Sequence, residues 1–131
     1  MQPPPPPPPP ISLGGNPFRP APADRTVLIS EEMLGECVRE ACAAHGWLFL
    51  WLRKTYNSSE GILDLSLIPM RHLDRRHILN RELKGYDRNG RLGTLTPEQA
   101  ITIEATNAAG GDARLWQPLD WTSGQILEEL K

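Results

Sequence analysis

The sequence predicts a small mixed domain of the α/β or α+β class, in which helices flank a small mixed β-sheet. Apolar residues recur at helical spacing after Ser30, and three short apolar segments follow between Trp47 and Lys84. A second helical segment, one more strand and a last helix complete the chain. The expected order is helix, strand, strand, strand, helix, strand, helix. Because the last strand follows a crossover helix, we expect it to run parallel to a neighbour.

Composition divides the 131 residues into two parts. Residues 1–24 are rich in proline, and Pro3–Pro10 is expected to be extended polyproline II. This arm is either a spacer or a ligand for the aromatic groove of a partner protein. Residues 25–131 are expected to form one folded domain. The net charge of −2 does not indicate a protein that is basic overall.

The first helix is predicted to begin after Ser30, a good N-cap, and to end before Gly46. Its apolar stripe runs from Leu34 to Cys42. Glu31 lies near the side of the stripe, so it either points towards a metal or only complements the helix dipole. The spacing of the two cysteines is unsuited to a disulfide within one helix, which favours small core residues in a reducing, cytoplasmic compartment.

Three strands are expected next, at residues 47–52, 62–68 and 78–84. The first is predicted to be buried, and the second and third to be antiparallel because their connection is short. The third carries polar residues, which suggests that one face or end contacts water. No apolar run is long enough to cross a membrane.

Two of these strands carry a candidate site. Asp64 lies within the second strand, while Glu82 and Lys84 share one face of the third and Leu83 takes the other. Two carboxylates beside a lysine suit a hard divalent cation and a phosphate. The alternative is a solvated acid and base at the edge of a sheet.

The segment from Arg71 to Arg91 has seven basic residues against three acidic ones. This local excess surrounds the candidate site, and either binds nucleic acid or is a solvated charged hairpin. Residues 85–93 are expected to form a flexible loop. Four arginines are candidate contacts to the DNA backbone: Arg75, Arg76, Arg88 and Arg91.

The second helix begins with a predicted capping box, with Thr96 as N-cap and Gln99 as its partner. Ala100, Ile103 and Ala108 are expected on its apolar face. A strand at residues 113–117 and a helix from Ser123 follow.

Five segments together resemble the VRR-NUC domain, a branch of the PD-(D/E)xK nuclease superfamily. They are SEEMLGECVREACAAHGW, GILDLSLI, RELKG, GTLTPEQ and ARLWQPLDW. The resemblance spans Ser30 to Leu130 and implies a restriction-endonuclease-like core. It departs at Leu63, where the superfamily expects proline, and at Gly35, where members often carry glutamine and where glycine costs the helix about 1 kcal/mol.

The resemblance also implies roles for individual residues. Asp64, Glu82 and Glu31 would bind the metal together with the Leu83 backbone carbonyl, and Lys84 would be the catalytic lysine. Gln99 matches a glutamine of the family's site, although the capping box explains it equally well. Trp121 is interpreted as structural, with stacking on DNA as the alternative.

The resemblance thus implies an endonuclease that uses Mg²⁺ or Mn²⁺ to cut branched or duplex DNA, leaving a 5′-phosphate and a 3′-hydroxyl. Small members of this kind are encoded by phages or prophages and act in the bacterial cytoplasm. Resolving a junction needs two cuts, which suggests a homodimer. The alternatives are a non-catalytic DNA-binding module on the same fold and an interaction protein recruited through Pro3–Pro10.

Overall fold

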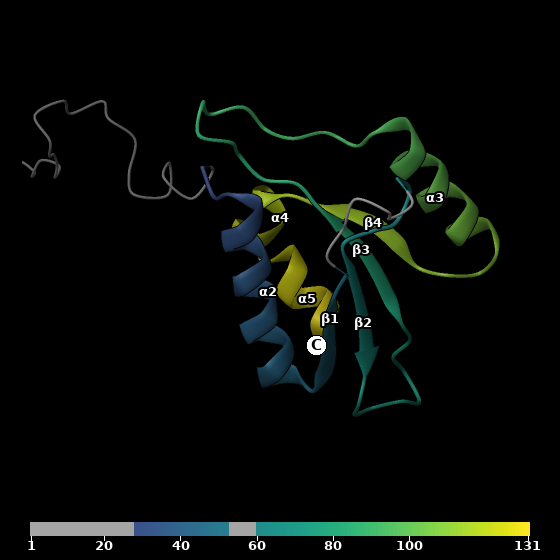
Figure 1. Cartoon of the computed structure of the whole chain (residues 1–131). Coiled ribbons are helices and arrows are strands. Elements are labelled where there is room, and N and C mark those ends of the chain that lie inside the picture. The colour runs from purple at the N-terminus through teal and green to yellow at the C-terminus, as the bar shows by residue number, and fades with distance from the viewer. Residues whose placement is uncertain (1–27, 53–59) are drawn as a thin grey trace, which may run out of the picture.

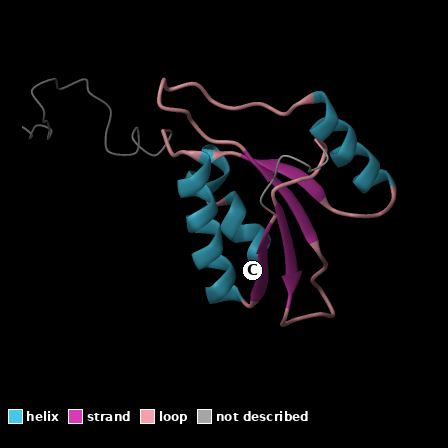
Figure 2. Ribbon diagram, in the orientation of Figure 1, coloured by secondary structure: helices cyan, strands magenta, loops and turns pink. Residues whose placement is uncertain are grey.

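A computed structural model describes residues 28–52 and 60–131 of the chain. Within them, one four-stranded sheet lies between helices (Figures 1 and 2). The elements are α2 (Glu31–His45), β1 (Trp47–Trp51), β2 (Leu65–Pro69), β3 (Leu79–Leu83), α3 (Pro97–Ala108), β4 (Ala113–Trp116), α4 (Pro118–Thr122) and α5 (Gln125–Leu130). The strands lie in the order β1-β2-β3-β4, and only β3 and β4 are parallel. The predicted mixed sheet and parallel last strand are confirmed.

The hydrophobic core lies on one face of the sheet, under α2 and α5. Leu83 of β3 and Trp116 of β4 point into it and are buried. Because side chains alternate along a strand, Glu82 faces the opposite side. That side carries α3, which packs against β4 (Figure 1). The Pro-rich arm at residues 1–24 and most of the loop after β1 lie outside the described residues.

The first helix begins and ends at the residues that the sequence predicted. The Ser30 hydroxyl accepts a hydrogen bond from the Met33 amide, and Gly46 ends the helix in the left-handed conformation, at a φ of 83°. The predicted stripe from Leu34 to Cys42 is buried. Burial raises the pKa of the Cys42 thiol to about 12, so this thiol stays protonated at neutral pH. Both cysteines are free, as expected.

Two predictions about the first strands are wrong. β1 is not buried throughout, because Leu48 and Leu50 face outward from an edge strand and are exposed. β2 begins at Leu65, so Asp64 precedes the strand instead of lying within it. The Asp64 amide donates to the Glu82 side chain instead of to a backbone carbonyl of a neighbouring strand.

The last third of the chain also differs from expectation. The predicted apolar face of α3 is wrong, because Gln99 is the buried residue of this helix. Pro118 ends β4 as expected, but it also starts α4, which the sequence analysis missed. Ser123 caps the end of α4, and the last helix begins only after Gly124. Trp121 packs against the core, which agrees with its structural interpretation.

Of the two polar residues from which water contact was predicted for the third strand, Asn80 is half-buried and Arg81 is buried. Arg81 is 1% exposed and lies over the Trp116 ring, with its guanidinium 4.9 Å from the ring centroid. It forms ion pairs with Asp112 at 3.1 Å and with Glu129 of α5 at 2.8 Å. Burial by itself would raise the pKa of Asp112, but its bond to His77 and the nearby arginines lower that pKa. The charge of Arg81 is therefore compensated inside the protein.

Gly85 allows the start of α2 to approach the end of β3. A Cβ at this position would lie less than 3.0 Å from the Glu31 amide nitrogen and the Ser30 carbonyl carbon. The Tyr86 amide donates to the Ile29 carbonyl at 2.9 Å, which joins the same two segments. The contact brings the first turn of α2 to the end of β3 that carries Lys84.

Among the described residues, no helix is both long enough and apolar enough to span a membrane.

Gly85→Ala should lower the free energy of unfolding by about 1–3 kcal/mol, because its new methyl group meets backbone atoms that cannot move aside. Urea unfolding followed by circular dichroism measures this change. Gly93→Ala is the matched control, since its Cβ would meet the flexible side chain of Lys84 at 3.3 Å. The control should stay within about 0.5 kcal/mol of wild type, and equal losses in the two variants would contradict the packing argument.

Candidate functional site

A pocket of about 400 Å³ opens where β2 begins and β3 ends. Because the two strands are antiparallel, these points lie at the same edge of the sheet. The first turn of α2 and the end of β1 complete the walls. The lining residues are Glu31, Glu32, Trp51, Leu52, Asp64, Glu82 and Lys84. The pocket thus brings Glu31 and Asp64, which are distant in the sequence, together with the neighbouring pair Glu82 and Lys84.

Asp64 and Glu82 are held by reciprocal hydrogen bonds. The Asp64 amide donates to Glu82 Oε1 at 3.1 Å, and the Leu83 amide donates to Asp64 Oδ2 at 2.9 Å. Each carboxylate therefore accepts a hydrogen bond from a backbone amide of the segment that carries the other carboxylate. Asp64 is 5% exposed and Glu82 is 1% exposed. Buried carboxylates are costly unless they are hydrogen-bonded or paired, and these bonds supply part of that compensation.

Gln99 serves two purposes that the sequence analysis treated as alternatives. Its Oε1 accepts a bond from the Thr96 amide at 3.0 Å, which completes the capping box of α3. Its Nε2 donates to Glu82 Oε2 at 2.9 Å. The amide can do both because its oxygen accepts while its nitrogen donates. Gln99 is therefore a positioning residue for Glu82 as well as a helix cap.

Lys84 lies beside Glu82 on the same face of β3, as the strand alternation predicted. Its Nζ is 3.4 Å from Glu82 Oε2, and its side chain is 16% exposed. Gly93 packs near the Lys84 stem, where an added Cβ would lie 3.3 Å from Cδ. The stem is thus confined while the amine faces the pocket, a placement that suits an anionic ligand.

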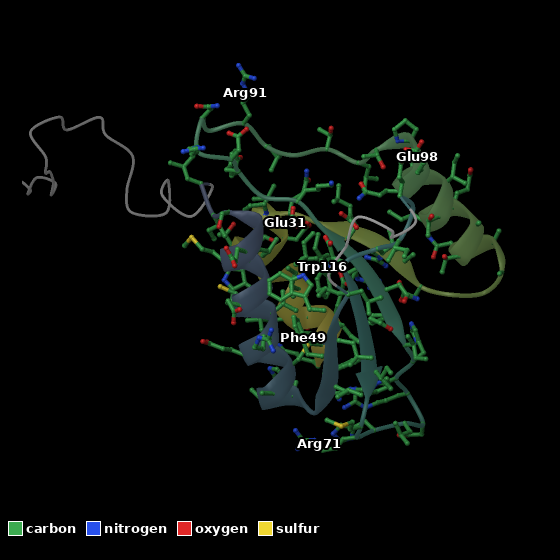
Figure 3. All side chains as sticks on the ribbon, in the orientation of Figure 1. Glu31, Phe49, Arg71, Arg91, Glu98 and Trp116 are labelled. Carbon is green, nitrogen blue, oxygen red and sulfur yellow. The ribbon has the colours of Figure 1, made fainter. Side chains whose placement is uncertain are left out.

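Glu31 and the Leu83 carbonyl, the two other predicted metal ligands, belong to different elements, α2 and β3. Glu31 lines the pocket from the start of α2 (Figure 3). Within the part of the chain that the structure describes, however, no three acidic, histidine or cysteine side chains gather closely enough to hold a metal on their own. The Leu83 amide points to Asp64, and the carbonyl of a strand residue leaves on the same side as its amide. This carbonyl is therefore directed to the Asp64 edge of β3.

Arg75 and Arg76 lie away from the pocket. They belong to the connection between β2 and β3, at the opposite end of these strands. Arg76 donates to the carbonyls of His45 at 2.8 Å and Leu130 at 2.9 Å, and Arg75 donates to the carbonyl of Lys131 at 3.1 Å. These bonds hold the ends of α2 and α5, so the structure does not bring these two arginines to the site.

Arg88 and Arg91 lie at the same end of the sheet as the pocket, in the loop between β3 and α3 (Figure 3, where Arg91 and the distant Arg71 are labelled). Both are exposed. Within residues 85–93, which were expected to form a flexible loop, the structure shows a hairpin braced by hydrogen bonds. Asp87 Oδ1 accepts bonds from the amides of Asn89 at 2.8 Å and Arg91 at 2.9 Å, and Tyr86 pairs with Leu92.

Three residues that line the pocket were not among the predicted site residues: Glu32, Trp51 and Leu52. The end of β1 was treated only as a buried strand, although its pairing with β2 brings Trp51 opposite Leu65, one residue from Asp64. Gly35 was treated as a loss to the helix. The structure gives it a reason, because a Cβ there would lie less than 3.0 Å from three ring carbons of Trp51.

Gln99→Ala should destabilise the protein by about 2–3 kcal/mol, because it removes a cap and leaves buried Glu82 with one donor fewer. Thr96→Ala, which removes only a capping bond, should cost about 1 kcal/mol. Urea unfolding of both variants measures the difference. Equal costs would mean that Gln99 acts only as a cap.

Comparison of the chain with protein-family models, with curated proteins and with solved structures finds no match.

Proposed function

We propose that this chain is a metal-dependent DNA endonuclease with a restriction-endonuclease-like core of the VRR-NUC type. The observation that carries the proposal is the convergence of Asp64, Glu82 and Lys84 in one pocket, with the lysine amine 3.4 Å from a Glu82 oxygen. Two carboxylates beside a cation suit phosphodiester hydrolysis, which needs charge neutralisation at the phosphate. The proposed setting is the cytoplasm of a bacterial host, in viral or prophage replication or repair.

The donor set fits a hard divalent cation. Asp64 and Glu82 supply carboxylate oxygens, the Leu83 carbonyl is directed to the same edge, and Glu31 lines the pocket. Mg²⁺ and Mn²⁺ prefer such oxygen ligands and usually keep several waters, so a full protein cage is not required. A bound cation would lower the pKa of a water molecule and neutralise charge on the phosphate.

Side chains of this protein are proposed to orient the attacking water and to hold Glu82. Lys84 is proposed to orient the attacking water and to offset charge on a phosphate oxygen. Gln99 holds Glu82 through the bond from Nε2, which keeps that carboxylate from rotating. Attack on phosphorus would break the bond to the 3′ oxygen, leaving a 5′-phosphate and a 3′-hydroxyl, as the family resemblance implies.

Arg88 and Arg91 are the proposed contacts to the DNA backbone. They are carried by a braced hairpin at the pocket's end of the sheet, and its Gly93 base lies against the Lys84 stem. Arginine contacts to phosphate provide affinity and little sequence information. We therefore propose recognition of DNA structure, with a homodimer as the assembly for paired cuts at a junction.

The second candidate is an accessory module that binds DNA without cutting it. The carboxylates and the lysine in one pocket argue against this candidate, because binding phosphate does not need two buried acids. Recruitment of a partner through Pro3–Pro10 concerns residues outside the described ones. It is compatible with either candidate.

The wild-type protein should cleave one or more members of a DNA panel in the presence of Mg²⁺ or Mn²⁺. The panel contains a four-way junction, a 5′ flap, a 3′ flap, a linear duplex and a single strand. Asp64→Asn should abolish cleavage, and Lys84→Ala should slow it by about 100-fold or more. Rates are measured by gel electrophoresis under single-turnover conditions.

Asp112→Asn is the matched control for Asp64→Asn, since Asp112 is a half-buried acid at the opposite end of β3. It should retain wild-type rates per folded molecule. Binding of DNA without cleavage under either metal would instead support the accessory module.

The double substitution Arg88→Ala and Arg91→Ala should weaken DNA binding and make it less sensitive to salt. The slope of log K against log salt concentration should fall by about one for each phosphate contact removed. Fluorescence anisotropy at several salt concentrations measures both effects. Arg75→Ala should change neither the affinity nor its salt dependence, because Arg75 lies at the other end of the sheet. Weaker DNA binding by Arg75→Ala, with unchanged binding by the double variant, would mean that DNA contacts that other end.

A further inference from the structure

One wall of the pocket is aromatic and has no part in the proposed chemistry. Trp51 ends β1 and pairs across the sheet with Leu65. The amide of the next residue, Leu52, donates to the Asp64 carbonyl at 2.6 Å. The backbone next to Trp51 is therefore hydrogen-bonded to the backbone of a proposed metal ligand, and Trp51 and Asp64 line the same pocket.

The position of the indole is set from two sides. Gly35 of α2 lies against its six-membered ring, where any Cβ would come within 3.0 Å of three ring carbons. Phe49 packs against it edge to face, with ring centroids 5.8 Å apart at 87°. Arg39 lies over both rings, 4.6 Å from the Phe49 centroid and 5.8 Å from that of Trp51. The ring is half-buried and belongs partly to the core, which makes it a rigid surface.

Charge is distributed unequally around the pocket. Glu31 and Glu32 line it from the start of α2, whereas Lys84 lines it from the end of β3. A phosphate is anionic and fits the lysine side. A nucleobase is uncharged and fits the side with the acids and Trp51, where a second phosphate would be repelled.

We propose that Trp51 is a stacking platform for a nucleobase adjacent to the scissile phosphate, and that the substrate presents an unpaired nucleotide there. The inference rests on the proposed function and specifies its substrate class. In continuous duplex DNA both faces of each base are covered by neighbours, so reaching Trp51 would require unstacking. A single strand, or the unpaired arm of a branched substrate, presents a free base face without that requirement. Stacking on an aromatic side chain accepts any base.

The test compares binding of two labelled single strands of equal length, a normal oligonucleotide and one with abasic sites in place of the bases. Both carry the same phosphates, so only the bases differ. Fluorescence anisotropy is measured in EDTA and again with Ca²⁺, so that binding is observed apart from cleavage. Wild type should bind the normal strand about 5- to 150-fold more tightly than the abasic strand.

Three variants separate stacking from packing. Trp51→Leu keeps an apolar side chain but no ring, and should remove the preference for the normal strand. Trp51→Phe keeps a smaller ring and should retain most of it. Gly35→Ala leaves Trp51 in place but displaces its ring, and should also reduce the preference, although alanine favours a helix over glycine. Circular dichroism confirms that each variant is folded.

The outcomes distinguish this inference from the proposed function. Equal binding of the two strands by wild type would overturn the stacking role, while metal-dependent cleavage would leave the endonuclease proposal standing. Equal weakening of both strands in Trp51→Leu would show a packing role only. Failure to bind any DNA would overturn both proposals. In cleavage assays, Trp51→Leu should raise KM for single-stranded and flap substrates more than it lowers kcat.

Discussion

The rest of the site depends on two hydrogen bonds that join the segment before β2 to the end of β3. The Asp64 amide donates to the Glu82 carboxylate, and the Leu83 amide donates to the Asp64 carboxylate. Truncating either side chain would leave one buried backbone amide without its acceptor. Both acids line the pocket.

Neighbouring residues also offset the charge of the buried Glu82 carboxylate. Gln99 and Lys84 both approach Glu82 Oε2, from α3 and from β3 respectively. Burying two anions is unfavourable by itself, and among the described residues Lys84 and three hydrogen bonds from amide groups offset part of this cost. A site that holds two carboxylates together at this cost is suited to a cation, and the proposal of a metal-dependent reaction is based on this feature.

Several arginines of the basic segment serve the fold and lie away from the pocket. At the end away from the pocket, Arg76 binds the carbonyls that end α2 and α5 and lies over the Trp47 ring. Arg81 is buried in ion pairs beneath α5. Much of the basic segment that surrounds the candidate motif in the sequence is therefore used within the protein. Of the four arginines predicted to contact DNA, only Arg88 and Arg91 lie at the end that carries the pocket.

Local patterns in the sequence predicted most of the secondary structure. The caps of α2 and α3 were found correctly because a cap depends on a few neighbouring residues. The pairing of β2 with β3 followed from their short connection. The start of β2 and the uncovered face of β1 could not be predicted, because they depend on which segments pack opposite them. α4 was missed because Pro118 was interpreted only as the end of a strand.

For the site, local pattern was enough to predict the residue types and the shared face of Glu82 and Lys84, since alternation along a strand is a local property. Three relations depend on the fold instead: Asp64 reaches these residues, Gln99 serves as both cap and positioning residue, and Gly35 packs against Trp51. These relations join α2, β1, β3 and α3, which are distant in the chain. No local spacing encodes them, because each depends on how closely two packed elements approach.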